Sequence, residues 1–177
     1  MKKVKKFELT NEFITNMFGT KLFRIRALVE FGDVEAGELG GYVEKESNLG
    51  HDDNAWVYDN AWVYGNARVY GDAQVSGDAR VCGNARVYGD ARVCGNGDYA
   101  YAHGFGSVNR TTTFFRLKDG GVGVRCGCFY GTLAQFRDKI RETHGESAIA
   151  EEYLDLAALM EKRFRRTGNE QKTEEES

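Results

Sequence analysis

The chain has 177 residues, which suits one elongated domain or one domain with an addition and is too short for two full-sized domains. Its formal net charge of -3, with 29 % charged and 41 % hydrophobic residues, is typical of a soluble protein and disfavours a polyanion-binding one. It contains 22 glycines and no proline, whereas average usage would give about nine prolines. We therefore expect a periodic structure to supply the turns.

The basic N-terminus resembles the start of a secretory signal only in its lysines. Glu8, Asn11, Glu12 and Asn16 interrupt the apolar stretch that such a signal requires, and no segment approaches the ~20 apolar residues of a membrane span. Neither a C-x-x-C pair nor a dense disulfide framework occurs among the cysteines, which are Cys82, Cys94, Cys126 and Cys128. We expect a cytoplasmic protein that does not contact membranes.

A period of six residues governs the middle of the chain. Seven consecutive hexads run from Ala55 to Asn96 and read AWVYDN, AWVYGN, ARVYGD, AQVSGD, ARVCGN, ARVYGD and ARVCGN. Alanine is always first and valine always third, which is the alternation of a short strand. Glycine, asparagine and aspartate then supply residues that tolerate a tight corner. Each hexad therefore predicts one three-residue strand and one corner.

Six residues are too few to bury their own apolar side chains, so successive units must stack into coils. If three hexads close one triangular coil, residues i and i+18 lie one above the other, about 4.8 Å apart. The valines then form three internal columns, which are Val57 with Val75 and Val93, Val63 with Val81, and Val69 with Val87. The predicted fold is mainly β, a short parallel β-helix.

The hexads resemble the hexapeptide repeat of left-handed parallel β-helices, in which a small residue follows an aliphatic one four places later, as Ala67 follows Val63. The region from Leu22 to Asn96, with Leu39-Gly-Gly-Tyr-Val and Asn54-Ala-Trp-Val-Tyr-Asp, is similar to a narrower group, the YdcK-like hexapeptide proteins of bacteria and their phages or prophages. That resemblance implies a left-handed β-helix and a phage or prophage origin, and it implies no activity.

We expect four segments along the chain. Residues 1–36 form an N-terminal strand cap, with Phe23, Ile25, Ala27, Val29 and Phe31 alternating against two arginines. Residues 37–107 form the hexapeptide β-helix, including a partial repeat at Tyr99. Residues 108–166 form an α+β cap, and residues 167–177 form a disordered acidic tail.

The expected C-terminal cap is a β-hairpin followed by two helices. The hairpin turns at Asp119-Gly120-Gly121 and returns with Val122, Val124, Cys126 and Cys128 on one face. Thr132 and Gln135 form a capping box for the first helix, which stops at Gly145. Ser147 caps the second helix, whose apolar stripe is Ile149, Tyr153, Leu156, Met160 and Phe164.

Enzymatic hypotheses have few candidate residues. His51 and His103 flank the hexads and are the candidates for a homotrimeric acyltransferase-like enzyme, because related β-helices place a histidine between subunits. No long excursion interrupts the hexads to form an acceptor pocket. The third histidine, His144, is distant in sequence, so a three-histidine zinc site is not expected. We expect a protein that is not an enzyme and has no catalytic residue, metal or cofactor.

Aromatic and basic residues point outward from the predicted coils, a composition typical of interface hot spots. We take eight of them as partner-binding candidates, namely Trp56, Trp62, Arg68, Tyr70, Arg80, Arg86, Tyr88 and Arg92. Acidic residues interleave with these arginines, so a nucleic-acid partner is not favoured. Alternatively, the N-terminal segment covers Trp56 and Trp62.

We therefore expect a non-catalytic, protein-binding β-solenoid. Because of the resemblance to phage proteins, we expect a phage or prophage protein that binds a host protein in the bacterial cytoplasm and modulates or inhibits it. A bacterial immune component is one such target. Besides the acyltransferase, a self-associating structural module is the other alternative, and a homo-oligomer is compatible with either.

Overall fold

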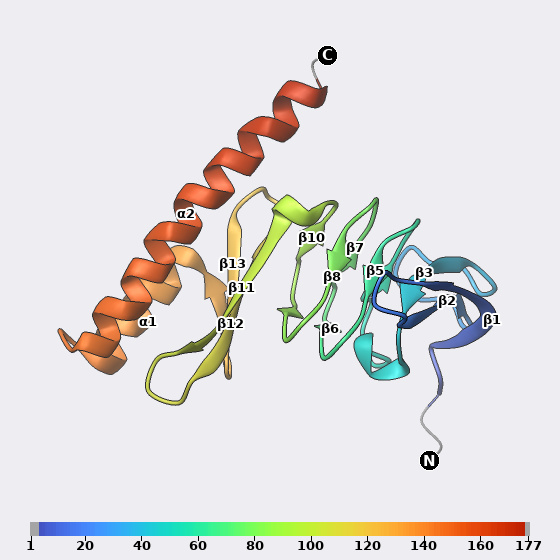
Figure 1. The fold of residues 1–177 in the computed structure, drawn as a ribbon, viewed down its shortest axis with the longest axis horizontal. Coiled ribbons are helices and arrows are strands. Elements are labelled where there is room, and N and C mark those ends of the chain that lie inside the picture. The colour runs from blue at the N-terminus through green and yellow to red at the C-terminus, as the bar shows by residue number, and fades with distance from the viewer. Residues whose placement is uncertain (1–3, 176–177) are drawn as a thin grey trace. The chain divides into compact units, whose positions relative to one another are not determined.

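Each hexad forms one short strand and one corner in the computed structural model, which describes residues 4–175 (Figure 1). The strands are β4 (Trp56–Val57), β5 (Trp62–Val63), β6 (Arg68–Val69), β7 (Gln74–Val75), β8 (Arg80–Val81), β9 (Arg86–Val87) and β10 (Arg92–Val93). They pair in parallel with a register of 18 residues, so that Trp62 lies beside Arg80 and Val69 beside Val87. The three-hexad coil predicted from the sequence is confirmed.

The coils build three walls around an apolar interior. One wall contains β4, β7 and β10, the second contains β5 and β8, and the third contains β6 and β9. Backbone hydrogen bonds join successive coils, as from the Trp62 N–H to the Ala79 carbonyl at 2.9 Å. The first and third residues of all seven hexads are 0 % exposed. Since each buried valine contributes roughly 1.5–3 kcal/mol, these columns supply the main driving force of the array.

The corners depend on backbone conformations that favour glycine. Gly71 has φ of 74°, and a Cβ atom there would lie 2.8 Å from the backbone nitrogen of Gly89 in the next coil. Asp59 occupies the equivalent position of the first hexad with φ of 53°. Its carboxylate accepts a hydrogen bond from the Gly77 N–H at 3.1 Å. The corners of successive coils thus pack closely on one another.

The N-terminal segment extends the second wall with antiparallel strands. These strands are β1 (Phe7–Thr15), β2 (Lys21–Ala27) and β3 (Leu39–Val43), and a short helix, η1 (Glu46–Asn48), follows them. The sheet order is β1-β2-β3-β5-β8, and β3 pairs in parallel with β5. The backbone of β3 approaches the solenoid so closely that a Cβ at Gly40 would lie 2.5 Å from the Val57 carbonyl oxygen.

The expected alternation in the N-terminal strand is wrong in detail. The pairing of β2 with β3 shifts register between Arg24 and Arg26. As a result Leu22 is buried with Ile25 and Ala27, whereas Phe23 is half-buried. The strand also ends at Ala27, before two of the residues assigned to it.

Contacts divide the chain into two units, Met1–Asn96 and Gly97–Ser177. The second unit contains an antiparallel sheet in the order β11-β12-β13-β14, followed by two helices. Its elements are β11 (Tyr99–Phe105), β12 (Arg110–Arg116), β13 (Val122–Cys126), β14 (Phe129–Thr132), α1 (Leu133–His144) and α2 (Ala148–Glu175), and η2 (Asn96–Asp98) precedes them.

Several predictions for the second unit agree with its structure. The hairpin of β12 and β13 and both helices are present. The Thr132 hydroxyl accepts from the Gln135 N–H at 3.2 Å, and the Gln135 side chain accepts from the Thr132 N–H at 2.9 Å. This capping box starts α1, and Gly145 ends it with φ of 58°.

The predicted segment boundaries need correction. The β-helix was expected to reach residue 107, but Tyr99 belongs to β11, which pairs antiparallel with β12 and therefore cannot continue the parallel coils. Cys128 does not share a strand face with Cys126, because β13 ends at Cys126 and Cys128 lies in an exposed turn after Gly127.

The tail expected to be disordered from residue 167 is helical as far as Glu175. Polar contacts, which an apolar pattern does not reveal, hold this end of α2. The Arg116 guanidinium donates to the Phe164 carbonyl at 2.8 Å and to the Thr167 hydroxyl at 3.2 Å. The Gln171 amide donates to the Asp98 carboxylate at 2.9 Å.

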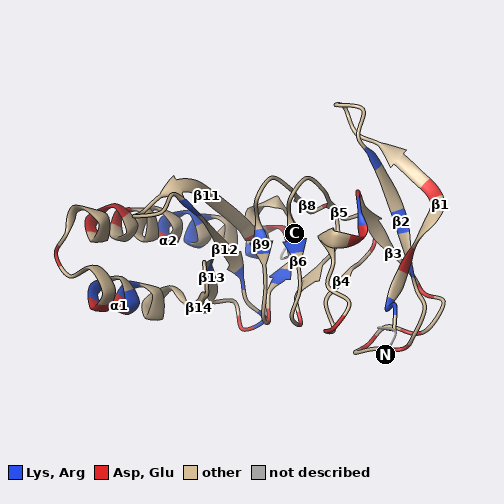
Figure 2. Cartoon of the chain, turned by 90° about the horizontal axis from the view of Figure 1, so that it is seen from below, with Lys and Arg blue, Asp and Glu red and all other residues tan. Residues whose placement is uncertain are grey.

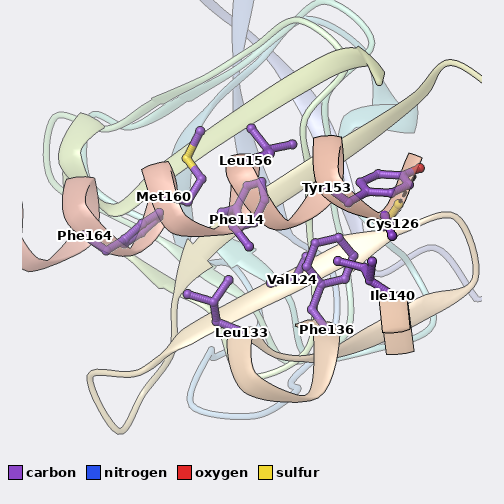
Figure 3. Packing of buried hydrophobic residues seen from close by; sticks show 12 residues of the cluster. Phe114, Val124, Cys126, Leu133, Phe136, Ile140, Tyr153, Leu156, Met160 and Phe164 are labelled. Atoms are coloured by element: carbon purple, nitrogen blue, oxygen red, sulfur yellow. Dashed lines mark hydrogen bonds between the residues drawn. The ribbon is translucent and has the colours of Figure 1, made fainter. Parts of the chain in front are cut away.

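Side chains from the sheet and both helices form the core of the second unit (Figure 3). Phe136 of α1 lies between Phe114 of β12 and Tyr153 of α2, with ring centroids 6.1 and 5.9 Å away. Leu133 and Ile140 add the rest of the α1 stripe. Among the described residues, no helix has both the length and the apolar character needed to cross a membrane.

Candidate partner-binding surface

Four of the eight predicted residues gather on the third wall of the solenoid and at the corner that follows it. Arg68 of β6 lies beside Arg86 of β9, and both side chains are exposed. Figure 2 shows the blue of basic residues on both β6 and β9. Tyr70 and Tyr88 come two residues later, and their ring centroids are 4.6 Å apart at an interplanar angle of 44°. We call these four residues the Arg-Tyr patch.

The patch concentrates positive charge next to aromatic rings. Like charges directly opposite each other on neighbouring strands repel, so the two guanidinium groups gain from a shared anion. Arg68 makes no ion pair with any residue that the structure describes, and its guanidinium lies 5.9 Å from the Tyr70 ring centroid. The short strands and tight corners hold all four backbones rigidly, so the patch is preorganised for binding.

Trp62 and Arg80 lie on a different wall. Arg80 places its guanidinium 4.2 Å from the centre of the Trp62 ring, a close cation–π contact. Together with Asn60, Asp78 and Asn96, these two side chains line a shallow hollow. Because β5 and β8 form the second wall and β6 and β9 the third, the predicted residues on these four strands are divided between two walls.

A family model described as the YdcK beta solenoid repeat matches residues 61–77 and 79–95. The first match spans β5, β6 and β7, and the second spans β8, β9 and β10, so each covers one coil of three strands. The repeat array is a YdcK-type β-solenoid. No curated protein matches the chain.

Trp56 cannot contact a partner from the surface of this YdcK-type solenoid, so its place among the partner-binding candidates is wrong, and the alternative that the N-terminal segment covers it is confirmed for this residue. Its side chain is 0 % exposed. The rings of Phe7 and Phe31 pack on it edge-on, with centroids 6.2 and 5.3 Å away. The N-terminal segment therefore covers Trp56, whereas Trp62 remains half-buried.

Arg92 is held by the YdcK-type solenoid itself. Its guanidinium donates to the Asp72 and Ala91 carbonyl oxygens, both at 2.9 Å, and the side chain is half-buried. Binding a partner would cost these two hydrogen bonds. Arg92 is therefore a weaker candidate than Arg68 or Arg86.

The two histidines considered for catalysis have different surroundings. His51 stacks on Phe7 with ring centroids 4.3 Å apart, and its Nδ1 accepts from the Lys6 N–H at 3.2 Å. Burial lowers the pKa of His51, and the neutral ring suits its role as a hydrogen-bond acceptor. His103 lies on β11, exposed, with Nδ1 2.7 Å from the Thr111 hydroxyl.

The N-terminal attachment of the YdcK-type solenoid also contains a buried lysine. Lys6 is 3 % exposed and donates to the Asp53 and Ala55 carbonyl oxygens at 2.8 and 2.7 Å. Burial lowers its pKa, and the Asp53 carboxylate 3.6 Å away partly offsets this. These contacts bind the start of the chain to the first coil.

No grouping of three or more histidine, cysteine, aspartate or glutamate side chains in the described part of the chain is placed to hold a metal ion. Arg110, Lys139 and Tyr153 line one cavity of the second unit. The sequence pattern assigned no role to Arg110, to Lys139 or to the hydroxyl group of Tyr153. No spacing rule places these residues together, because they come from three separate elements.

Proposed function

We propose that this chain is a non-catalytic protein that binds another protein through the Arg-Tyr patch. The observation that supports the proposal is the 18-residue register, which places Arg68 directly beside Arg86 on the third wall and Tyr70 beside Tyr88 at the corner that follows it. Arginine and tyrosine are enriched among residues that contribute most to binding energy. The two adjacent cations favour a partner with a carboxylate-rich surface.

The partner is a host protein of the bacterial cytoplasm, and binding modulates or inhibits it. This part of the proposal rests on the resemblance to proteins of bacteria and their phages or prophages. Bacterial immune components are one class of target that such a protein would act on. A phage or prophage origin belongs to the same proposal.

The test uses charge reversal on a fixed scaffold. The double variant Arg68→Glu, Arg86→Glu keeps the buried columns intact, because both side chains are exposed. The double variant Arg141→Glu, Arg165→Glu makes the same change in net charge on exposed helix positions of the second unit and serves as the matched control. A partner captured with the wild-type chain from bacterial lysate is purified and titrated against all three proteins.

The expected result is a loss of affinity of at least about a hundredfold in the patch variant, with less than about threefold change in the control. Affinity of the wild type falls steeply with added salt, because screening weakens contacts between charges. Hydrogen exchange on the purified pair then protects β6 and β9. Equal losses in both variants, or protection confined to other strands, would overturn the proposal.

A further inference from the structure

The second unit contains a hollow between the sheet and the two helices. Its volume is about 260 Å³. Phe129 of β14 and Phe136 and Ile140 of α1 give it an apolar lining, and Tyr153 of α2 borders it. Figure 3 shows the Phe136, Ile140 and Tyr153 side chains close together beside Cys126. The cavity therefore offers aromatic and aliphatic contacts to a small ligand.

The charged residues that line the cavity are basic, and the Glu152 carboxylate outside the lining acts electrostatically on Tyr153. Arg110, Lys139 and His144 contribute to its lining, and no aspartate or glutamate does. The Lys139 ammonium pairs with Glu142 at 3.0 Å. Arg110, in contrast, makes no ion pair with a described residue. A chain with a net charge of -3 thus presents an unneutralised guanidinium at an apolar cavity, which favours an anionic ligand.

The backbone next to the cavity leaves space for the Arg110 side chain. A Cβ atom at Gly127 would lie 1.9 Å from Nη1 of Arg110, and Gly127 has φ of 59°. The guanidinium therefore lies directly against the turn between β13 and β14. A residue with a side chain at position 127 would push Arg110 away from the cavity.

Tyr153 adds a neutral hydrogen-bond donor. Burial and the neighbouring Cys126 raise the pKa of Tyr153 to about 12, so its hydroxyl stays protonated at physiological pH. The Cys126 sulfur lies 4.0 Å from the Tyr153 oxygen. A protonated phenol can donate a hydrogen bond to an anion.

The size of the cavity limits the ligand. An apolar cavity of about 150 Å³ holds one benzene molecule, so one of 260 Å³ suits about ten non-hydrogen atoms. From the apolar lining, the free Arg110 guanidinium and the Tyr153 hydroxyl, we infer that this cavity binds a small carboxylate with one aromatic ring. The ring packs on Phe129, Phe136 and Ile140, and the carboxylate meets Arg110.

Phenylacetate has this size and charge and serves as the probe. Its neutral analogue phenylacetamide matches it in shape, and inorganic phosphate matches only its charge. In calorimetric and NMR titrations of the full chain, phenylacetate binds with a dissociation constant of about 1 mM or lower. The resonances that shift belong to the cavity residues. Phenylacetamide binds at least about tenfold more weakly, because it cannot pair with the guanidinium.

Variants locate the site within the second unit. Arg110→Gln weakens phenylacetate binding about tenfold and reduces the preference over phenylacetamide. Thr143→Trp, at an exposed position on the cavity lining, blocks entry and abolishes binding. Arg141→Gln, which removes an exposed charge outside the lining, leaves the affinity unchanged. Circular dichroism establishes that each variant is folded.

Three outcomes would overturn the inference. The first is absence of saturable phenylacetate binding to the wild-type chain. The second is equal binding of phenylacetate and phenylacetamide to the wild-type chain, which would show that charge plays no role. This comparison needs no variant, so it remains valid even if a variant fails to fold. The third is displacement of phenylacetate by phosphate at similar concentrations, which would indicate a general anion site without an aromatic contribution.

Discussion

The solenoid and the second unit obtain their order in different ways. In the hexads the paired strand residues lie 18 positions apart, as Val57 pairs with Val75, and the same contact recurs from coil to coil. In the second unit, Arg116 reaches Thr167 and Gln171 reaches Asp98, contacts that occur once and join distant parts of the sequence. A repeated contact is visible in a sequence, whereas a single contact is not.

This contrast predicts that the two units respond separately to core substitutions. Both tryptophans, Trp56 and Trp62, belong to the first unit, and both α-helices belong to the second. Tryptophan fluorescence therefore monitors the solenoid, and the helical circular dichroism signal monitors the second unit.

The largest effect is expected from Val75→Asp in the middle of an internal column. Val75 is 0 % exposed and pairs with strands on both sides. A buried unpaired carboxylate costs several kcal/mol, at least about 3. The tryptophan transition in urea should collapse while the helical signal persists. Simultaneous loss of both signals would show that the units fold as one.

Phe136→Ala is the converse test in the second unit. Phe136 is 3 % exposed, and its ring contacts the rings of Phe114 in β12, Phe129 in β14 and Tyr153 in α2. Truncation of such a side chain costs about 3–5 kcal/mol. The helical circular dichroism signal should be lost at a lower urea concentration than in the wild-type chain, whereas the midpoint of the tryptophan fluorescence transition should not change. A shift of the tryptophan midpoint by the same amount would contradict separate behaviour.

Gly71→Ala tests the contribution of corner stacking within the solenoid. The new methyl group has both an unfavourable φ of 74° and a close approach to Gly89, so we expect a loss of about 2–3 kcal/mol. Gly37→Ala is the control, because Gly37 has φ of 91° and open space around its Cβ position. The control should lose only about 1 kcal/mol. Equal losses of stability in the two variants would show that the strain of φ alone causes the loss.

The smallest effect is a pH dependence limited to the first unit. The folded-state pKa of His51 is lowered by burial, so the unfolded chain binds this proton more readily. Stability contributed by neutral His51 is complete above the unfolded-state pKa near 6.5 and falls as the pH drops below it. Urea titrations followed by tryptophan fluorescence at pH 7.5 and 5.5 should show this loss, and His51→Gln should reduce it. The same loss in His51→Gln would assign it to other groups.

Sequence reasoning succeeded wherever the relevant contact is local or repeated. The capping box of Thr132 and Gln135 spans three residues, so it was predictable and is confirmed. The hexad pattern wrongly placed Trp56 among the surface residues. Trp56 has the same place in its hexad as exposed Arg68, but Phe7 and Phe31 cover it. The period of the hexads contains no information about a segment that precedes them.

The candidate surfaces follow the same distinction. The pairing of Arg68 with Arg86 and of Tyr70 with Tyr88 follows from the three-hexad coil alone, because each pair is 18 residues apart. The backbone contacts of Arg92 were not predictable, because they depend on how one side chain folds back over the adjacent coil.

The sequence alone determined the parallel coils, their 18-residue register and the buried columns of alanine and valine. A period of six gives each hexad identical neighbours, so one rule places all of them. Only the tertiary structure decided the burial of Trp56, the length of α2 and the meeting of Arg110 with Tyr153 at one cavity. These features arise from aperiodic contacts between distant segments, and their energies depend on geometry that composition and spacing do not encode.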